Sequence, residues 1–153
     1  MLLEVLRKEH ISRNVTAKDW ETAVRYAGGL LVDTGSVDPG YVDQMVAISK
    51  EAGPYIVLVP GVALAHARPT DGVHEICLSL ITLARPVEFG NADNDPVRVV
   101  AALAALDHAH HLNALRELVQ FIGDTRNIDA LCRCETDDAV LELFRRFCGT
   151  RAI

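Results

Sequence analysis

Four short runs rich in Val, Ile and Leu fill the middle of the chain and limit most strongly what it can fold into. They cover residues 55–59, the segment around 62–65, residues 75–83 and residues 97–106. Apolar runs of this length with few charges are typical of strands in a sheet that is covered on both faces. A segment rich in Asn and Asp, Gly90 to Pro96, is predicted to form the turn before the last strand.

Helical patterns precede this block. Residues 1–15 are expected to form a short helix and a strand at the sheet edge. Thr16 is the predicted N-cap of a helix whose apolar stripe runs from Trp20 to Leu31. Asp38-Pro39 is predicted to begin a second helix, because an Asp cap followed by a first-turn proline is a common helix start.

Helices return after the last strand. One stripe runs from Leu112 to Ile122, a short helical turn covers Asn127 to Arg133, and Thr136 is predicted to cap the final helix. Helices at both ends of a strand-rich centre predict an α/β fold, a three-layer α/β/α sandwich around one sheet. At 153 residues, a single domain spanning 1–153 is expected.

Composition and charge exclude several classes of function. Half of the residues are hydrophobic, which is typical of a globular chain, and the net charge of −6 provides no basic face for nucleic acid. Arg98 and Asp107 bracket the longest apolar stretch, so no segment is expected to span a bilayer. Because the N-terminal residues lack a signal-peptide pattern, a cytoplasmic location is expected.

The chain has four cysteines, Cys77, Cys132, Cys134 and Cys148. Cys132 and Cys134 are separated by one residue, which is one short of the Cys-x-x-Cys spacing of redox and zinc sites. We therefore expect four reduced structural thiols.

A segment bounded by prolines, Pro60 to Pro69, carries the first candidate site. It places His66 between two predicted strands, with Arg68 two residues further on. A histidine in such a constrained segment can act as a base, a metal ligand or a nucleophile, although a lone histidine is more often structural. Arg68, taken alone, is more often a solvated charge than an anion clamp.

A second group of histidines, His108, His110 and His111, follows Asp107 where the last strand gives way to a helix. His111 is expected at or next to the helix N-terminus, where free N–H groups and the helix dipole favour a phosphate and a neutral imidazole. A metal site is the alternative, but the group lacks a helical His-x-x-x-His spacing and a carboxylate at a familiar distance. His10 and His74 are predicted to be surface histidines.

His66 together with one histidine of this group would suit phosphoryl transfer through a phosphohistidine. A neutral imidazole can attack phosphorus without a separate base, and the protein mainly positions the group and balances its charge. A second imidazole or the Arg68 guanidinium would supply that balance.

The stretch Gly53 to Pro69, GPYIVLVPGVALAHARP, resembles the active-site segment of IIA components of the bacterial phosphoenolpyruvate-dependent sugar phosphotransferase system. It is most similar to the fructose–mannitol superfamily and, within it, to the ascorbate-type branch. Further matches are Asp93 to Val97, Ala105-Leu106-Asp107, and His111 followed by an amphipathic helix. The resemblance extends from Trp20 to the final helix.

The resemblance implies that His66 is phosphorylated by the histidine-containing phosphocarrier protein. The phosphoryl group would then pass to a cysteine of a IIB component, with a IIC membrane permease as an indirect partner. His111 matches the family's second active-site histidine. The implied fold has a mixed sheet between helix layers, and the resemblance implies no cofactor and no metal.

Two positions depart from the family pattern. Ala65 stands where a proline usually precedes the active histidine, and Ala67 replaces the glycine of the fructose-like branch but suits the ascorbate-type branch. The loss of that proline loosens the preset backbone geometry. Two other functions stay open: a regulatory IIA-like module whose phosphorylation state controls a protein partner, and a metal- or anion-binding domain using His108, His110 and His111. The sugar and the oligomeric state, including a homodimer, also stay open.

Overall fold

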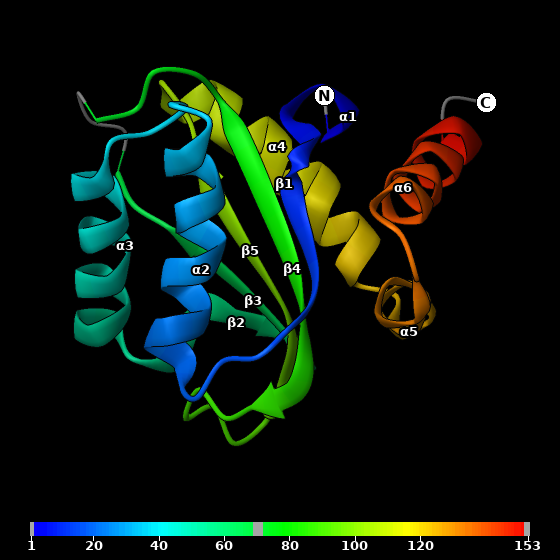
Figure 1. Cartoon of the computed structure of the whole chain (residues 1–153), viewed down its shortest axis with the longest axis horizontal. Helices are drawn as coiled ribbons and strands as arrows, with labels where there is room; N and C mark the ends of the chain where they lie inside the picture. Colours follow the sequence, from blue (N-terminus) through cyan, green and yellow to red (C-terminus); the bar gives the residue numbers. More distant parts are fainter. Residues whose placement is uncertain (1, 69–71, 152–153) are drawn as a thin grey trace.

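A five-stranded mixed sheet lies between two layers of helices (Figure 1). This computed structural model describes residues 2–68 and 72–151. The strands are β1 (Leu6–Val15), β2 (Val57–Val59), β3 (Val62–His66), β4 (Cys77–Val87) and β5 (Val97–Ala104). Their order is β1-β4-β5-β3-β2, and β1 with β4 and β3 with β5 pair in parallel, whereas the other two pairs are antiparallel. The predicted three-layer sandwich with a mixed sheet is confirmed.

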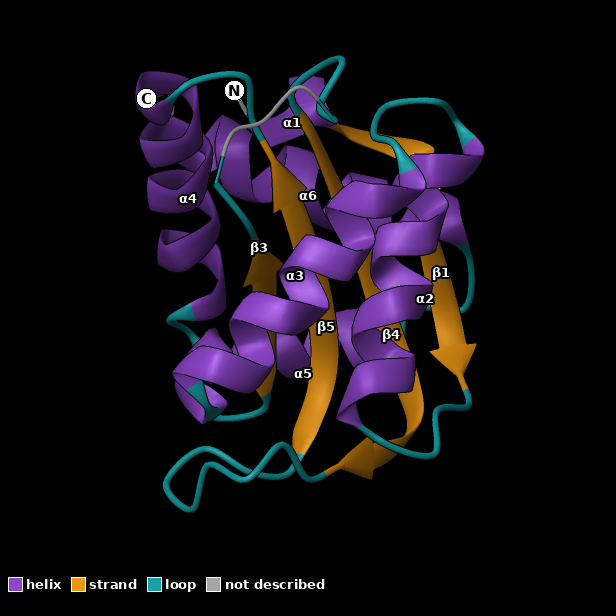
Figure 2. Cartoon of the chain, turned by 90° about the vertical axis from the view of Figure 1, so that its left-hand side faces the viewer, coloured by secondary structure: helices purple, strands orange, loops and turns teal. Residues whose placement is uncertain are grey.

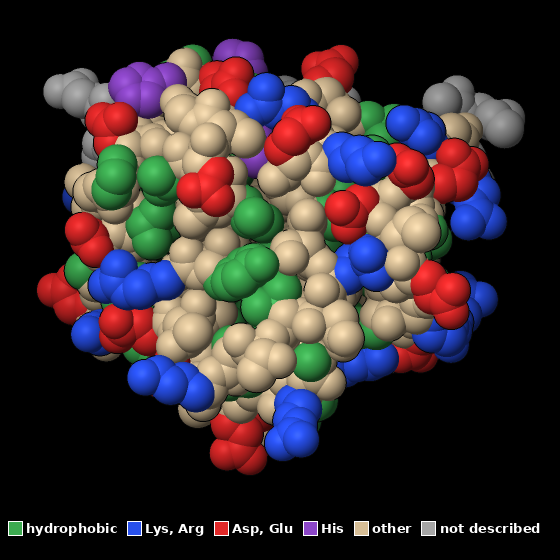
Figure 3. Space-filling view, in the orientation of Figure 1, with side chains coloured by type: hydrophobic (Ala, Val, Ile, Leu, Met, Phe, Trp, Pro, Cys, Tyr) green, Lys and Arg blue, Asp and Glu red, His purple; other side chains and the backbone are tan. Residues whose placement is uncertain are grey.

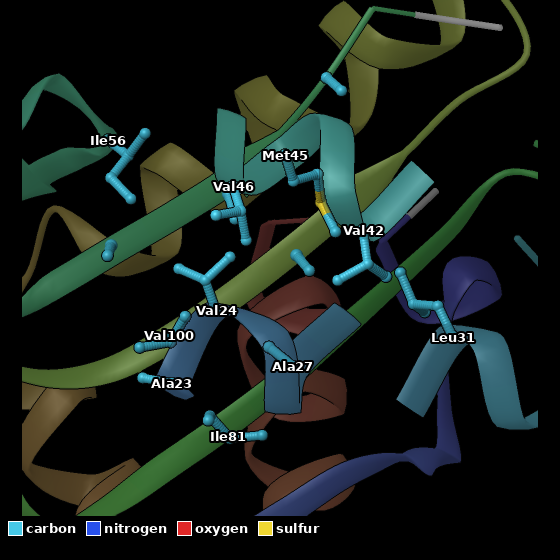
Figure 4. Packing of buried hydrophobic residues seen from close by; sticks show 14 of the residues in the cluster. Ala23, Val24, Ala27, Leu31, Val42, Met45, Val46, Ile56, Ile81 and Val100 are labelled. Atoms are coloured by element: carbon cyan, nitrogen blue, oxygen red, sulfur yellow. The ribbon is translucent and has the colours of Figure 1, made fainter. Parts of the chain in front are cut away.

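One face of the sheet is covered by α2 (Trp20–Asp33) and α3 (Pro39–Ala52), which lie side by side across it (Figure 2). A short 3-10 helix, η1 (Pro54–Ile56), joins α3 to β2. Figure 4 shows the apolar side chains of this layer meeting those of the strands. Val24 and Met45 are fully buried against sheet residues such as Val100, so burial of the two helical stripes fixes this layer.

The other face is covered by four helices, α1 (Leu2–Val5), α4 (His108–Ile122), α5 (Thr125–Arg133) and α6 (Asp137–Arg151) (Figure 1). Aromatic rings hold this layer together. Phe121 of α4 stacks on Phe144 of α6 with ring centroids 4.2 Å apart, and Phe147 meets Phe121 edge-on at 5.1 Å. No helix in the described part of the chain is long and apolar enough to cross a membrane.

The predicted starts of α3 and α6 are confirmed, whereas the predicted start of α2 was wrong. The α2 helix begins at Trp20 and its N-cap is Asp19, whose carboxylate accepts a hydrogen bond from the Thr22 amide at 2.8 Å. The Thr16 cap was therefore wrong, because an Asp three residues later offers a better acceptor to the first turn. Asp38 precedes Pro39 at the start of α3, and Thr136 accepts from the Ala139 amide at 3.0 Å, as predicted.

The expectation for His10 was also wrong, whereas His74 is exposed as predicted. His10 lies on β1 with 0% of its surface exposed, and its Nε2 lies 2.7 Å from the hydroxyl of Thr34. The connection after α2, which contains Thr34, folds over His10. On the surface, the Nε2 of His74 lies 2.8 Å from the carboxylate of Asp38.

All four cysteines are free thiols. Burial raises the pKa of Cys77 to about 12, and it also raises the pKa values of Cys132 and Cys134. These thiols are held in their protonated, unreactive form, as expected for structural cysteines.

Candidate functional site

His66 is the last residue of β3 and lies where two parallel strands end together. It pairs with Leu103 near the end of β5, and its side chain is half-buried. Its Nδ1 lies 3.4 Å from the backbone oxygen of Leu64. The carboxyl ends of neighbouring parallel strands are a common place for a functional group in an α/β sheet.

The alternation of side chains along β3 determines which helix layer His66 faces. Val62 and Leu64 belong to the core cluster that includes Ala114 and Leu118 of α4. The residues between them face the opposite cluster with α2 and α3, as does Ala67. Because successive strand residues point to opposite faces, His66 is directed toward the α4 layer.

Helix α4 starts at the same edge of the sheet. β5 ends at Ala104, and Asp107 caps α4 three residues later. His108 and His110 lie exposed in the first helical turn, and in Figure 3 most of the visible histidine surface lies along the top of the molecule. The backbone places His111 in the same turn, but its side chain lies outside the described residues. The structure thus brings His66 and the start of α4 to one face and one edge, although helix α4 begins earlier than its apolar stripe indicated.

Asp107 organises the first turn of α4. Its carboxylate accepts from the His110 amide at 2.8 Å and contacts the His110 Nδ1 at 2.7 Å. These hydrogen bonds, with the backbone N–H contribution largest, lower the pKa of Asp107. The Nε2 of His110 lies on the side of the ring away from this contact. The free N–H groups and the positive end of the helix dipole also favour an anion here.

Arg68 is exposed two residues beyond His66. Residues 72–74, which precede β4, lie along the α2–α3 connection and form hydrogen bonds with it. The Asp38 amide donates to Gly72 at 2.8 Å, the His74 amide donates to Ser36 at 2.9 Å, and Val37 forms an isolated bridge with Val73. The segment after His66 is therefore anchored where it approaches β4.

Tyr41 was not among the predicted site residues, but its hydroxyl reaches the backbone next to His66. It lies 3.2 Å from the Ala67 amide, which donates to it, and within 3.1 Å of the Ala67 oxygen and 3.2 Å of the Leu103 oxygen. A buried phenol must find polar partners, and this requirement was the signal in the sequence that could have drawn attention to Tyr41.

A polar network at the same edge was also missed. Arg7 donates to Glu75 at 2.8 Å and to Ser36 at 3.0 Å, and Ser36 donates to Glu75 at 2.6 Å. The Ser36 hydrogen bond is the main cause of the lowered pKa of Glu75. This network fastens the start of β1, the α2–α3 connection and the residues before β4 to one another.

Two surface depressions lie away from His66. One, of about 210 Å³, is lined by residues including Trp20, Lys50 and Phe89, and the other, of about 310 Å³, by residues including Arg13 and Cys134. Neither is lined by His66 or Arg68. Among the described side chains, no group of three His, Cys, Asp or Glu residues could hold a metal ion. The alternative of a metal site formed by His108, His110 and His111 depends on the side chain of His111, which lies outside the described residues.

The fold is that of IIA phosphotransferase proteins, as comparison with solved structures shows. The solution structure of the mannitol-specific cryptic phosphotransferase enzyme IIA of Escherichia coli aligns with a TM-score of 0.83 and 28% identity, over 95% of this chain and 99% of that one. A complex of enzyme IIA for mannitol with phosphorylated enzyme IIB from Escherichia coli aligns with a TM-score of 0.80 and 27% identity, over 91% and 97%.

The chain belongs to the family described as "Phosphoenolpyruvate-dependent sugar phosphotransferase system, EIIA 2", whose profile matches residues 4–147. It is 37% identical over 131 residues to the ascorbate-specific EIIA component of Escherichia coli K12, covering 85% of each chain. The ascorbate-specific component of Salmonella typhimurium matches with the same identity and coverage. The resemblance to the ascorbate-type branch is therefore confirmed, and the chain is a phosphotransferase protein of sugar transport.

Proposed function

We propose that the chain carries a phosphoryl group on Nε2 of His66 during sugar uptake. The main support is the place of His66, at the open end of β3 and facing the start of α4, in a chain of this family. Its partners would be the histidine-containing phosphocarrier protein as donor, a cysteine of a IIB component as acceptor, and a IIC permease indirectly. This role would place the protein in the cytoplasm with its donor.

The contact of Nδ1 with the Leu64 oxygen supports the choice of nitrogen. In the tautomer that carries its proton on Nδ1, the lone pair of His66 is on Nε2 and can attack phosphorus directly. The donor N–P bond breaks as the Nε2–P bond forms. In the second step the IIB thiolate forms an S–P bond and the His66 N–P bond breaks, which restores the neutral ring.

Charge around the phosphoryl group would come from three sources. The N-terminal turn of α4 offers backbone N–H groups and positive potential, the guanidinium of Arg68 offers a mobile positive charge, and His111 would offer a second imidazole. The loose transition state of phosphoryl transfer needs such positioning and charge balance rather than additional covalent chemistry.

The relatives support a IIB component as the acceptor. A IIA protein with 27% identity is solved in complex with its phosphorylated IIB partner, and relatives at 37% identity are ascorbate-specific components. We infer that this chain serves a IIB partner of the ascorbate type.

A phosphorelay assay tests the site. With phosphoenolpyruvate, enzyme I and the phosphocarrier protein, we expect an acid-labile mass gain of one phosphate per chain. His66→Ala should abolish it, whereas His74→Gln, which changes an exposed histidine at the same edge, should label normally. Normal labelling of the His66→Ala protein would show that another residue is phosphorylated.

A second assay tests the roles of His111 and Arg68. Each alanine variant should still be phosphorylated on His66, but transfer from the phosphorylated protein to IIB should slow about 100- to 1000-fold, as expected when one group that stabilises the transition state is lost. The transfer is followed by mass spectrometry after mixing. Transfer at the wild-type rate in both variants would show that neither His111 nor Arg68 takes part in the transfer.

A further inference from the structure

We propose that Tyr41 is a positioning residue that holds His66 in its reactive orientation through the backbone of Ala67. This inference rests on the proposed phosphorylation of His66. Tyr41 lies on α3, 25 residues before His66 in the chain, and it does not face the sheet surface on which the His66 ring lies. Its effect would therefore be transmitted through the peptide, not through contact with the phosphoryl group.

The hydroxyl of Tyr41 binds the backbone at the residue that follows the last paired residue of β3. The pairing of β3 with β5 ends at His66 and Leu103, one residue before Ala67. The Ala67 amide donates to the Tyr41 hydroxyl at 3.2 Å, and that hydroxyl can donate its one hydrogen to the oxygen of Ala67 at 3.1 Å or of Leu103 at 3.2 Å. One side chain thus ties the ends of both parallel strands together.

Burial makes these contacts important. Tyr41 is 1% exposed and Ala67 3%, so water cannot replace a lost hydrogen bond at this point. Burial also raises the pKa of Tyr41, which keeps the hydroxyl protonated and able to donate. The peptide between His66 and Ala67 therefore has one well-defined orientation.

The orientation of that peptide sets the direction of the His66 ring. Side chains on either side of the peptide point to opposite faces, with His66 toward α4 and Ala67 toward α3. Neither Ala65 nor Ala67 restricts the backbone as a proline would, so the constraint at this position comes from Tyr41. Without it, the peptide could rotate and move Nε2 away from the line of attack.

The variant Tyr41→Phe removes the hydroxyl and keeps the ring. We expect kcat for phosphorylation of His66 to fall about 10- to 100-fold, the loss that a misplacement near 1 Å produces, with the KM for the phosphorylated carrier protein changed less than about twofold. The ring nitrogen NMR signals of His66 should shift or broaden. If the hydroxyl contributes only to the stability of the fold, the variant should have a lower melting temperature, with kcat and the His66 NMR signals unchanged.

Ser49→Ala is the matched control. Ser49 is a second buried hydroxyl on α3, and it donates within its own helix to the Met45 oxygen at 2.8 Å. Its removal should leave kcat and the His66 signals at wild-type values. If Tyr41→Phe behaves like Ser49→Ala, Tyr41 has no positioning role, while wild-type labelling on His66 would still support the proposed function.

Hydrogen exchange in the wild-type protein tests the inference without any variant. The Ala67 amide should exchange as slowly as amides within β3, such as that of Leu64, because Tyr41 holds it. Exchange as fast as that of an exposed loop amide would overturn the inference. Absence of label on His66 in the wild-type protein would instead overturn the proposed function on which the inference rests.

Discussion

The position of His66 along β3 determines which helix layer its side chain faces, because a shift of one residue would turn the side chain to the other face of the sheet. If His66 occupied the place of Ala65 or Ala67, its ring would be buried against α2 and α3 instead of being directed toward the α4 layer. The segment around His66 was recognisable from the sequence, because its residues are contiguous. The contributions of Tyr41 and His10 were not, because their partners are distant in the chain and neither residue has a local pattern that reveals its contacts.

The burial of His10 predicts a dependence of stability on pH. Burial and, next, the charge of Arg7 lower the pKa of His10, while Glu75 opposes them. The folded state therefore holds His10 neutral, and the unfolded chain binds the proton more readily. Stability from this residue is present above its ordinary pKa of about 6.5 and is lost as the pH falls below that value.

Urea unfolding of wild type and His10→Gln across pH 7.5 to 5 measures this effect. The variant should be less stable at pH 7.5, because it loses the imidazole contact with Thr34, but its stability should fall less between about pH 6.5 and 5 than that of the wild type. Equal slopes in that range would mean that His10 is not held neutral in the folded protein.

At the scale of helices and strands, close approach of α2 and α3 forms the layer that supports the strand ends. Gly28 of α2 makes this approach possible: a Cβ there would lie 2.8 Å from the Met45 Cε and 2.9 Å from a methyl carbon of Val42. The helices themselves were predictable from their stripes and caps, apart from the choice of Thr16 over Asp19. The need for glycine at residue 28 was not, because it depends on which helix packs alongside.

Gly28→Ala and the neighbouring Gly29→Ala make a matched pair. Ala at 28 should destabilise the protein by about 1–3 kcal/mol through overpacking, which outweighs a gain in helix propensity of up to about 1 kcal/mol. Ala at 29, where nothing lies within 4 Å, should show only that gain. Denaturant unfolding measures both, and a stabilised Gly28→Ala protein would contradict the close packing of α2 on α3.

At the scale of the whole molecule, both helix layers share one sheet. The apolar runs predicted the burial of the sheet on two sides, and the structure gives each face its own core. The mixed strand order β1-β4-β5-β3-β2 was not contained in those runs, since strand direction follows from the connections and not from the composition of the strands. Because every strand contributes to both cores, the layers should unfold together.

Substitutions in the two cores test this coupling. Leu31→Ala in the α2 layer should cost about 2–5 kcal/mol and Phe144→Ala in the α6 layer about 3–5 kcal/mol, since both side chains are fully buried. In each variant, circular dichroism and tyrosine or tryptophan fluorescence should report one transition with a lowered midpoint. Separate transitions for the two layers would show that the sheet does not couple them.

The central claim is that Nε2 of His66 carries the phosphoryl group, and NMR of the phosphorylated protein tests it most directly. Protein labelled with ¹⁵N in its histidines and phosphorylated through the relay should show one phosphohistidine, with phosphorus coupled to Nε2 of His66. Phosphorus coupled to Nδ1 of that ring, or to a nitrogen of His108, His110 or His111, would contradict the claim.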